Sequence, residues 1–204
     1  MFNRRYTLNE SYFRVINTEE KAYILGFICA DGYIGQDRLN ICLSVVDTEI
    51  LEMIKKEFNS NQILKFYERP NPYNKEKTCK MVELQISSRK FVKPLLNMNL
   101  GINKTYTLNS DILKFIPRYL VKAFLRGYFD GDGNVMYGKK YTSGIKYNIN
   151  ICGNEEFLLN TYQKHFPSSN KMYFEKKSKQ TFIWKLSSKD KVKEFLHWLY
   201  NNSK

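Results

Sequence analysis

The sequence predicts an α+β fold that is built twice, as two tandem copies of one unit. The pattern Ser-Ser-x-x-x-Val-Lys-x-x-Leu occurs at residues 87–96 and again 100 residues later, at 187–196. Two apolar helical segments end in Asp-Gly and place their aspartates 101 residues apart, at Asp31 and Asp132. Runs of alternating apolar and polar residues follow each segment, which is typical of half-buried strands. A repeat of this length indicates a duplicated structural unit.

The first copy is expected to run helix, two strands, helix, two strands, helix. Asn17 or Thr18 suits the N-cap of the first helix, and Glu20 would complete a capping box with Asn17. In residues 38–45 the apolar side chains take alternate positions, so one face of that strand is buried. The expected elements are a helix over about 18–31, a strand over 38–45, a helix over 49–58, strands over 62–69 and 79–87, and a helix over about 90–98.

The second copy repeats this order. Pro117 suits the first turn of a helix, and Asn154 suits an N-cap. The expected elements are a helix over 119–131, a strand over 145–152, a helix over 155–166, strands over 171–177 and 181–187, and a helix over about 191–200. The chain is therefore divided into a first half over 1–104, with residues 1–17 as an N-terminal arm, a linker over 105–116 and a second half over 117–204.

The amino-acid composition limits which binding partners and which cellular compartment are expected. A net charge of +13 and a pI near 9.5 indicate a polyanionic partner, with nucleic acid preferred over an anionic membrane surface. No apolar run approaches transmembrane length, and no signal peptide is visible. The four cysteines form no Cys-x-x-Cys pair, so buried thiols in a reducing, intracellular compartment are expected. Only two histidines are present, which argues against zinc catalysis.

The two helical segments also carry the expected chemistry. Gly26 and Ala30 share one helix face, as do Gly127 and Gly131, and such strips of small residues let two helices approach closely. An aspartate at the helix C-terminus lies at the unfavourable end of the helix dipole. Two such carboxylates facing each other at ~5 Å would repel by about 3 kcal/mol at an effective dielectric of ~20. A hard divalent cation between them would explain the pair; the alternative is that the aspartates only cap solvated helix ends.

The two segments resemble the motifs of the LAGLIDADG homing endonucleases in their two-motif, single-chain form. The first reads Ile-Leu-Gly-Phe-Ile-Cys-Ala-Asp-Gly from Ile24, and the second reads Leu-Arg-Gly-Tyr-Phe-Asp-Gly-Asp-Gly from Leu125. The resemblance implies two antiparallel, saddle-shaped sheets that flank a central pair of motif helices with pseudo-twofold symmetry, in a monomer. It also implies hydrolysis of one phosphodiester per DNA strand across the minor groove, which leaves short 3′ overhangs.

The resemblance further implies a metal site. Two or three Mg²⁺ ions would be shared by Asp31 and Asp132, with the backbone carbonyls of Ala30 and Gly131 as further ligands. Family enzymes often add a lysine near the active site, and Lys104 and Lys204 stand at equivalent places; the alternative is that both are solvated. The chain departs from its relatives at three positions. Cys29 replaces the acid that Asp130 retains in the second motif, and Val46 and Gly153 stand where some members carry glutamine.

The polar faces of the predicted strands would read the DNA. Strands fit the major groove, where all four base pairs are distinguishable. The alternative is that these are ordinary solvated faces. The outward residues are Arg38, Asn40, Ser44, Lys65, Tyr67, Arg69, Glu83 and Gln85 in the first half, and Lys146, Asn148, Asn150, Tyr173, Glu175, Lys177 and Lys185 in the second.

The expected partner is double-stranded DNA with a long target that is pseudo-palindromic or asymmetric. Two other functions remain open: an RNA maturase that assists intron splicing and binds intron RNA, and a DNA-binding regulator that does not cleave. The presence of both Asp31 and Asp132 favours the enzyme, because a binding protein has no use for two facing carboxylates.

Overall fold

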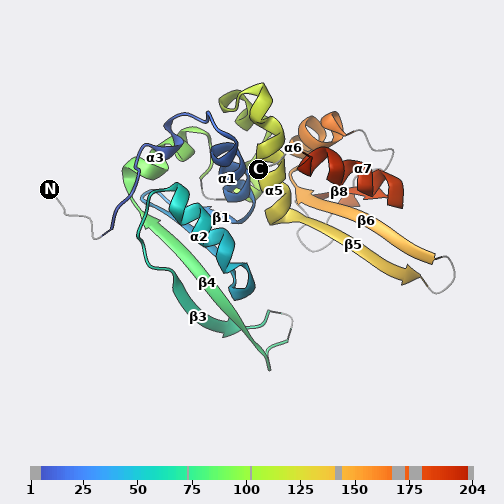
Figure 1. Cartoon of the computed structure of the whole chain (residues 1–204), viewed down its shortest axis with the longest axis horizontal. Helices are drawn as coiled ribbons and strands as arrows, with labels where there is room; N and C mark the ends of the chain where they lie inside the picture. Colours follow the sequence, from blue (N-terminus) through green and yellow to red (C-terminus); the bar gives the residue numbers. More distant parts are fainter. Residues whose placement is uncertain are drawn as a thin grey trace. The chain divides into compact units, whose positions relative to one another are not determined.

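The computed structural model describes residues 6–72, 74–101, 103–140, 144–166, 173–174 and 181–201. It contains two four-stranded antiparallel sheets with the same strand order, β1-β2-β4-β3 and β5-β6-β8-β7 (Figure 1). The predicted α+β duplication is therefore confirmed. The chain divides into two compact units: unit 1 holds Met1–Val15 and Asp31–Ile102, and unit 2 holds Ile16–Ala30 and Asn103–Lys204.

Unit 1 is one sheet with helices on a single face. The strands are β1 (Gly32–Ile34), β2 (Arg38–Ser44), β3 (Lys65–Pro70) and β4 (Thr78–Ser87), and the helical elements are η1 (Tyr12–Arg14), η2 (Val45–Asp47), α2 (Thr48–Glu57) and α3 (Arg89–Asn97). Helices α2 and α3 contact β2, and α2 also contacts β4 (Figure 1). The strand residues on the helix side, such as Leu39, Ile41, Leu84 and Ile86, are fully buried, as the alternation predicts.

Aromatic rings fill the space beneath the helices of unit 1. The rings of Phe13, Phe58 and Phe91 contact one another edge to face, with centroids 4.8 to 5.7 Å apart. Tyr12 joins them through Phe58, at 4.9 Å. Tyr12 and Phe13 come from the segment predicted as an N-terminal arm, so this part of the arm belongs to the folded core.

Unit 2 contains the other sheet and both motif helices, apart from the last residue of α1. Its core includes Trp184, Tyr162 and Phe195, all fully buried. The elements are α1 (Glu19–Asp31), α4 (Lys104–Thr107), η3 (Ser110–Phe115), η4 (Arg118–Leu120), α5 (Val121–Asp132), β5 (Gly133–Lys140), β6 (Gly144–Gly153), α6 (Glu155–Leu158), the π-helical η5 (Leu159–Gln163), β7 (Tyr173–Phe174), β8 (Phe182–Ser187) and α7 (Lys189–Tyr200).

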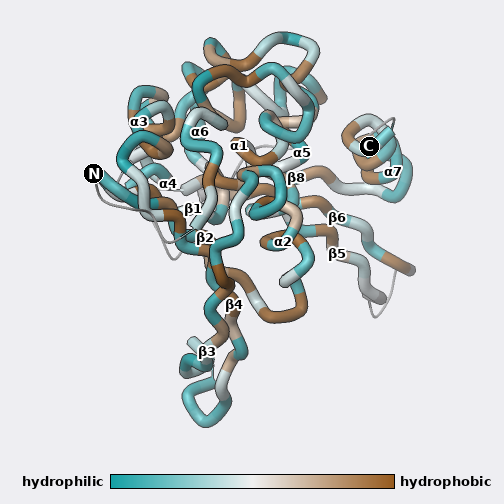
Figure 2. The backbone as a smooth tube through the Cα atoms, turned by 60° about the vertical axis from the view of Figure 1, so that its left-hand side comes forward, coloured by the Kyte–Doolittle hydropathy of each residue, from teal (hydrophilic) through white to brown (hydrophobic). Residues whose placement is uncertain are grey.

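The two units have other boundaries than the predicted halves, and unit 2 also includes the predicted linker. Helix α1 groups with the second half of the chain, because its glycine face packs on α5. The predicted linker, 105–116, carries most of α4 and all of η3. Figure 2, which colours the backbone by residue hydropathy, shows hydrophobic residues along α1 and hydrophilic residues at the tip of the β3–β4 hairpin. This agrees with the burial of α1.

Equivalent serines cap equivalent helices in the two copies. The hydroxyl of Ser88 accepts a hydrogen bond from Phe91 N in α3, and that of Ser188 accepts from Lys191 N in α7. Thr18 caps α1 by accepting from Lys21 N, at 3.3 Å, so Thr18 rather than Asn17 holds this position. None of the helices within the described ranges has the length and apolar character that a membrane crossing requires.

Candidate active site and nucleic-acid interface

Helices α1 and α5 meet through glycine, within unit 2. A Cβ atom added at Gly26 would lie 2.0 Å from the carbonyl oxygen of Phe124, and one added at Gly127 would lie 1.9 Å from that of Tyr23. Both distances are far shorter than any van der Waals contact, so neither position has room for a side chain. The structure thus brings two of the four predicted interface residues into direct backbone contact, while Ala30 and Gly131 are half-buried near the helix ends.

This helix contact has internal twofold symmetry. Gly26 approaches Phe124 and Tyr128, and Gly127 approaches Tyr23 and Phe27. Each of the second-motif residues stands 101 positions after its first-motif counterpart, which is also the spacing of the two aspartates. The two helices therefore use the same surface on one another, which is the signature of an isologous contact.

The aspartates end these helices. Asp31 is the last residue of α1 and is exposed, and Asp132 is the last residue of α5 and is half-buried. The glycine that follows α5, Gly133, has an extended backbone with φ −89° and begins β5. A Cβ atom there would lie 2.4 Å from Phe129 O, so it is close packing that excludes a side chain.

The side chain of Lys104 caps the C-terminal end of α1. Its side chain is only 7% exposed, and its ammonium donates to the carbonyl oxygens of Cys29 at 2.7 Å and Ala30 at 2.8 Å. A cation on these last carbonyls satisfies acceptors that the helix leaves open and complements the helix dipole. The Ala30 carbonyl was predicted to bind metal; in this structure a metal would have to share that oxygen with the ammonium group.

Asp132 lies among groups that stay neutral. Burial raises the pKa of the Cys29 thiol to about 12, the Lys104 ammonium opposes this and the Asp132 carboxylate adds to it. Burial also raises the pKa of the Tyr128 phenol well above its usual value, and Asp132 raises it further. The Tyr128 hydroxyl donates to Cys152 O at 2.9 Å. The Cys29 thiol and the Tyr128 phenol therefore keep their protons at neutral pH beside Asp132.

The donor set of these aspartates fits a hard divalent ion. Within the described residues no group of three or more His, Cys, Asp or Glu side chains is arranged to hold a metal. Mg²⁺ is commonly bound by one or two carboxylates, with water and substrate phosphate as the other ligands. An aspartate ending each motif helix matches that requirement, whereas zinc would need more nitrogen or sulfur ligands.

Asp130, the acid at the sixth position of the second motif, has a structural role. Its two carboxylate oxygens accept hydrogen bonds from the hydroxyls of Tyr23, at 2.8 Å, and Tyr200. Arg126, 7% exposed, lies over the Tyr23 ring with its guanidinium carbon 5.5 Å from the centroid. Asp130 thus joins α5 to α1 and α7, whereas the equivalent Cys29 is buried.

The two positions where some relatives carry glutamine differ from each other. Val46 lies in η2 and is 83% exposed. Gly153 ends β6, where a Cβ atom would lie 2.9 Å from the Tyr128 hydroxyl. Glycine at this position therefore makes room for the phenol that neighbours Asp132.

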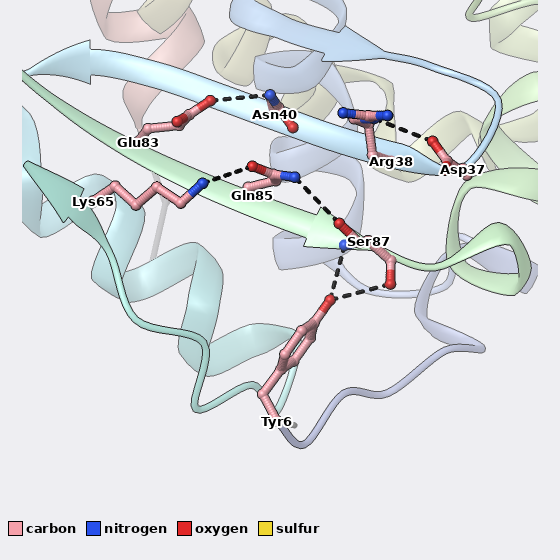
Figure 3. A network of polar contacts seen from close by, with 8 residues as sticks. All are labelled: Tyr6, Asp37, Arg38, Asn40, Lys65, Glu83, Gln85 and Ser87. Atoms are coloured by element: carbon pink, nitrogen blue, oxygen red, sulfur yellow. Dashed lines mark hydrogen bonds and ion pairs between the residues drawn. The ribbon is translucent and has the colours of Figure 1, made fainter. Parts of the chain in front are cut away.

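The first predicted DNA-contact set shares one face of the unit 1 sheet. The register pairs Asn40 with Gln85 and Lys65 with Glu83, and these positions lie opposite the buried helix side. Several of these side chains contact each other (Figure 3): Asn40 Nδ2 donates to Glu83 Oε1 at 3.0 Å, and Lys65 Nζ donates to Gln85 Oε1 at 2.9 Å. The face contains Arg38, Asn40, Ser44, Lys65, Tyr67, Arg69, Glu83 and Gln85, as the alternation predicts.

The second set is described in part. Lys146, Asn148, Asn150 and Lys185 lie on one face of the unit 2 sheet, with Asn150 paired to Lys185. The hydroxyl of Ser187 donates to Asn148 Oδ1 at 2.8 Å. Tyr173 lies in β7, where the register pairs it with Ile183 of β8. The predictions for Glu175, Lys177 and Lys204 lie outside the described residues.

Sequence reasoning missed three residues of these sites. Ser87 follows the same alternation as Gln85 and could have been found from it. Tyr128 stands in the second motif, 101 positions after Phe27 of the first. Nothing in the sequence ties its hydroxyl to Asp132. Tyr6 contacts Ser87 across 81 residues, which no local pattern reveals.

Comparisons with known proteins agree with this geometry. Residues 120–197 match the sequence family described as a LAGLIDADG-like domain. The homing endonuclease I-WcaI, bound to its DNA recognition sequence, superposes with a TM-score of 0.64 and 18% identity over 93% of this chain and 85% of its own. A variant of I-SmaMI gives 0.59 and 13% over 90% and 83%, and the meganuclease I-AabMI bound to uncleaved DNA gives 0.52 and 15% over 86% and 81%.

A curated protein also matches. The tRNA-splicing ligase RtcB of Methanopyrus kandleri is 28% identical over 200 residues, which cover 86% of this chain but 20% of the ligase. The chain thus spans about a fifth of the length of that relative. The resemblance carried by the two motifs is confirmed: residues 120–197 match the LAGLIDADG-like domain, and the chain has the fold of the LAGLIDADG meganucleases.

Proposed function

We propose that this chain is a site-specific endonuclease that hydrolyses one phosphodiester in each strand of double-stranded DNA. The observation that carries the proposal is the symmetric contact of α1 and α5, two helices that each end in an aspartate. One carboxylate per motif suits a reaction that occurs once per strand. The fold shared with meganucleases bound to DNA supports the same reading.

In the proposed reaction, Asp31 and Asp132 supply carboxylate oxygens to Mg²⁺, with the Gly131 and Ala30 carbonyls as further ligands. When bound, the metal would activate the attacking water and stabilise the leaving oxygen. The structure of I-SmaMI with its DNA target in the presence of calcium supports a divalent ion in proteins of this fold. Lys104 holds the end of α1 through two carbonyls and so keeps the residue before Asp31 in place; Lys204 is proposed as its counterpart.

The outward sheet faces would bind the DNA. They combine arginine, lysine, asparagine and glutamine, which have the donors and acceptors that read base edges in the major groove. The net charge of +13 would supply attraction to the phosphates. From the family resemblance we also propose that cleavage occurs across the minor groove and leaves short 3′ overhangs.

RNA binding is the second candidate. RtcB of Methanopyrus kandleri is a tRNA-splicing ligase, but this chain spans about a fifth of its length. Several solved structures that share the fold, among them those of I-AabMI, I-SmaMI and I-CpaMI, were determined with DNA bound. DNA is therefore the preferred partner, and the maturase and the non-cleaving regulator are the alternatives.

The proposal is tested by selecting cleaved sites from a random duplex library with Mg²⁺. One long cleaved site, cut in both strands, is expected from the native chain and none from the Asp31→Asn/Asp132→Asn double variant. EDTA should stop cleavage. Selective binding of the duplex without cleavage at any Mg²⁺ concentration would exclude the endonuclease function and favour a DNA-binding regulator. Binding of structured RNA in preference to duplex DNA would favour the maturase.

A further inference from the structure

We propose that Tyr6 is a positioning residue for base selection, because it fixes the orientation of the Gln85 side-chain amide through Ser87. The inference rests on the proposed DNA-binding function and adds a residue outside the strands to it. Three parts of the unit 1 structure carry the argument: the free edge of β4, the anchoring of Tyr6, and the hydrogen-bond chain that ends at Lys65 (Figure 3).

The first part is the edge of β4. Strand β3 pairs with β4 only as far as Glu83, whereas β4 continues to Ser87. The hydroxyl of Tyr6 takes the place of a neighbouring strand at the end of β4: it accepts from Ser87 N at 2.8 Å and donates to Ser87 O at 3.2 Å. One phenol therefore satisfies both backbone groups of this residue and holds it in strand conformation.

The second part is the anchoring of Tyr6 itself. Its neighbour Thr7 exchanges two hydrogen bonds with Asn61: Thr7 N donates to Asn61 Oδ1 at 2.7 Å, and Asn61 N donates to Thr7 Oγ1 at 3.2 Å. Two residues further on, Asn9 N donates to Phe58 O at 2.8 Å. The segment is thus attached to the loop after α2, so the Tyr6 ring has a fixed base from which to reach Ser87.

The third part is the chain of side chains that leads away from Ser87. Gln85 Nε2 donates to Ser87 Oγ at 3.3 Å, and Gln85 Oε1 accepts from Lys65 Nζ at 2.9 Å. Lysine can only donate, so the amide oxygen must face Lys65 and the amide nitrogen must face Ser87. The hydroxyl of Ser87 therefore completes a defined orientation of the Gln85 amide.

A competing orientation is available across the strands. Asn40 pairs with Gln85 in the register, and its Oδ1 is buried without a hydrogen-bond partner in the described part of the chain. Directly opposite side chains in antiparallel strands lie within reach of each other. If Ser87 is released from Tyr6, the amide nitrogen of Gln85 can turn toward Asn40. The amide oxygen and the amide nitrogen that Gln85 presents to a base would then lie in different positions.

This orientation matters for recognition. A glutamine amide recognises adenine by donating to N7 and accepting from the N6 amino group, and a displaced amide loses that match. A good pair of this kind contributes about 1–3 kcal/mol of discrimination against the wrong base. The expected phenotype of a disordered Gln85 is therefore local: base preference is lost at one or two adjacent positions of the target, and binding elsewhere is kept.

The test compares base preference at every target position for the native chain, Tyr6→Phe and Ser87→Ala, by binding to a library of single-base target variants in Ca²⁺. Tyr6→Phe keeps the ring and removes both hydrogen bonds to Ser87. Both variants should lose about tenfold in discrimination at the same one or two positions. Tyr12→Phe is the matched control, because it removes a phenol hydrogen bond in the same segment, to Glu57 Oε2 at 3.2 Å, away from Gln85. It should keep the native profile.

A double-variant cycle separates positioning from a general loss of folding. In a Gln85→Ala background, Tyr6→Phe should have no further effect on base preference, because the group it positions is gone. Equal loss of affinity at all positions, or an undiminished effect in the Gln85→Ala background, would overturn the inference and leave the proposed function intact. A native chain without any base preference would overturn both.

Discussion

At the scale of single residues, the ends of the motif helices show how charge is arranged around the proposed reaction. Lys104 places a buried ammonium on two carbonyls of α1, and Asp132 lies beside a thiol and a phenol whose pKa values are raised, chiefly by burial. Asp130, two residues before Asp132, instead accepts hydrogen bonds from two tyrosine hydroxyls. Neighbouring acids on one helix therefore have separate roles, which can be tested with the same substitution.

Asp31→Asn and Asp132→Asn should each abolish cleavage of both strands, by about 10³-fold or more, because a metal ligand that stabilises several kcal/mol of transition-state charge is lost. Binding of the duplex in the absence of metal should change only a few fold. Gel assays on end-labelled duplex measure both. Asp130→Asn is the control: it should lower the Tm, through loss of the contacts with Tyr23 and Tyr200, and leave cleavage in place. Wild-type cutting by either Asp31→Asn or Asp132→Asn would exclude the metal assignment.

Cys29 should make stability depend on pH in the alkaline range. Its pKa is raised from an ordinary value near 9 to about 12, chiefly by burial. Between these values the unfolded chain has lost the thiol proton and the folded chain keeps it, so stability falls as pH rises, by about 1.4 kcal/mol per pH unit for this group. Urea unfolding between pH 9 and 12 should show a shallower decline in Cys29→Ala than in the native chain. Identical slopes would show that the thiol does not carry the shift.

At the scale of elements, the α1–α5 contact depends on two backbones that touch. Helix propensity favours alanine over glycine by about 1 kcal/mol, so the two glycines are maintained against local preference. Steric crowding decides the matter, because a Cβ atom at 1.9 or 2.0 Å from a carbonyl oxygen forces the helices apart. The same separation would move both aspartate-bearing helix ends.

Gly26→Ala and Gly127→Ala should each cost about 1–3 kcal/mol in stability, as overpacking of a well-packed interior does. The Tm should fall by about 2–4 °C for each kcal/mol in a chain of this size. Gly138→Ala in β5 is the matched control, since nothing lies within 4 Å of a Cβ added there, and it should change stability by no more than about 0.5 kcal/mol. A calorimetric scan of the three variants decides the matter; equal Tm values for all three would contradict the described contact.

At the scale of the whole molecule, the charge of +13 sets the mode of binding. A protein that neutralises several phosphates releases the counterions condensed on them, so affinity falls steeply as salt rises. Where 6–10 phosphates are contacted, the expected loss is about 10³- to 10⁵-fold between 50 and 200 mM salt. Fluorescence anisotropy of a labelled target across this range measures the slope. An affinity that does not respond to salt would exclude a basic DNA-binding face.

The sequence by itself determined the duplication, the strand faces and the identity of the two helix-ending aspartates, because these follow from local periodicity and from a repeat of 100 to 101 residues. Alternation placed all eight outward residues of the first sheet correctly, since a strand has a period of two. Only the tertiary structure decided that Lys104 binds the last carbonyl groups of α1 and that Asp130 joins three helices. It also decided that the Tyr6 hydroxyl bonds to the backbone of Ser87 at the edge of β4. These contacts join residues 70 to 107 positions apart, and the direction of a side chain over such a separation is fixed by packing rather than by any local pattern.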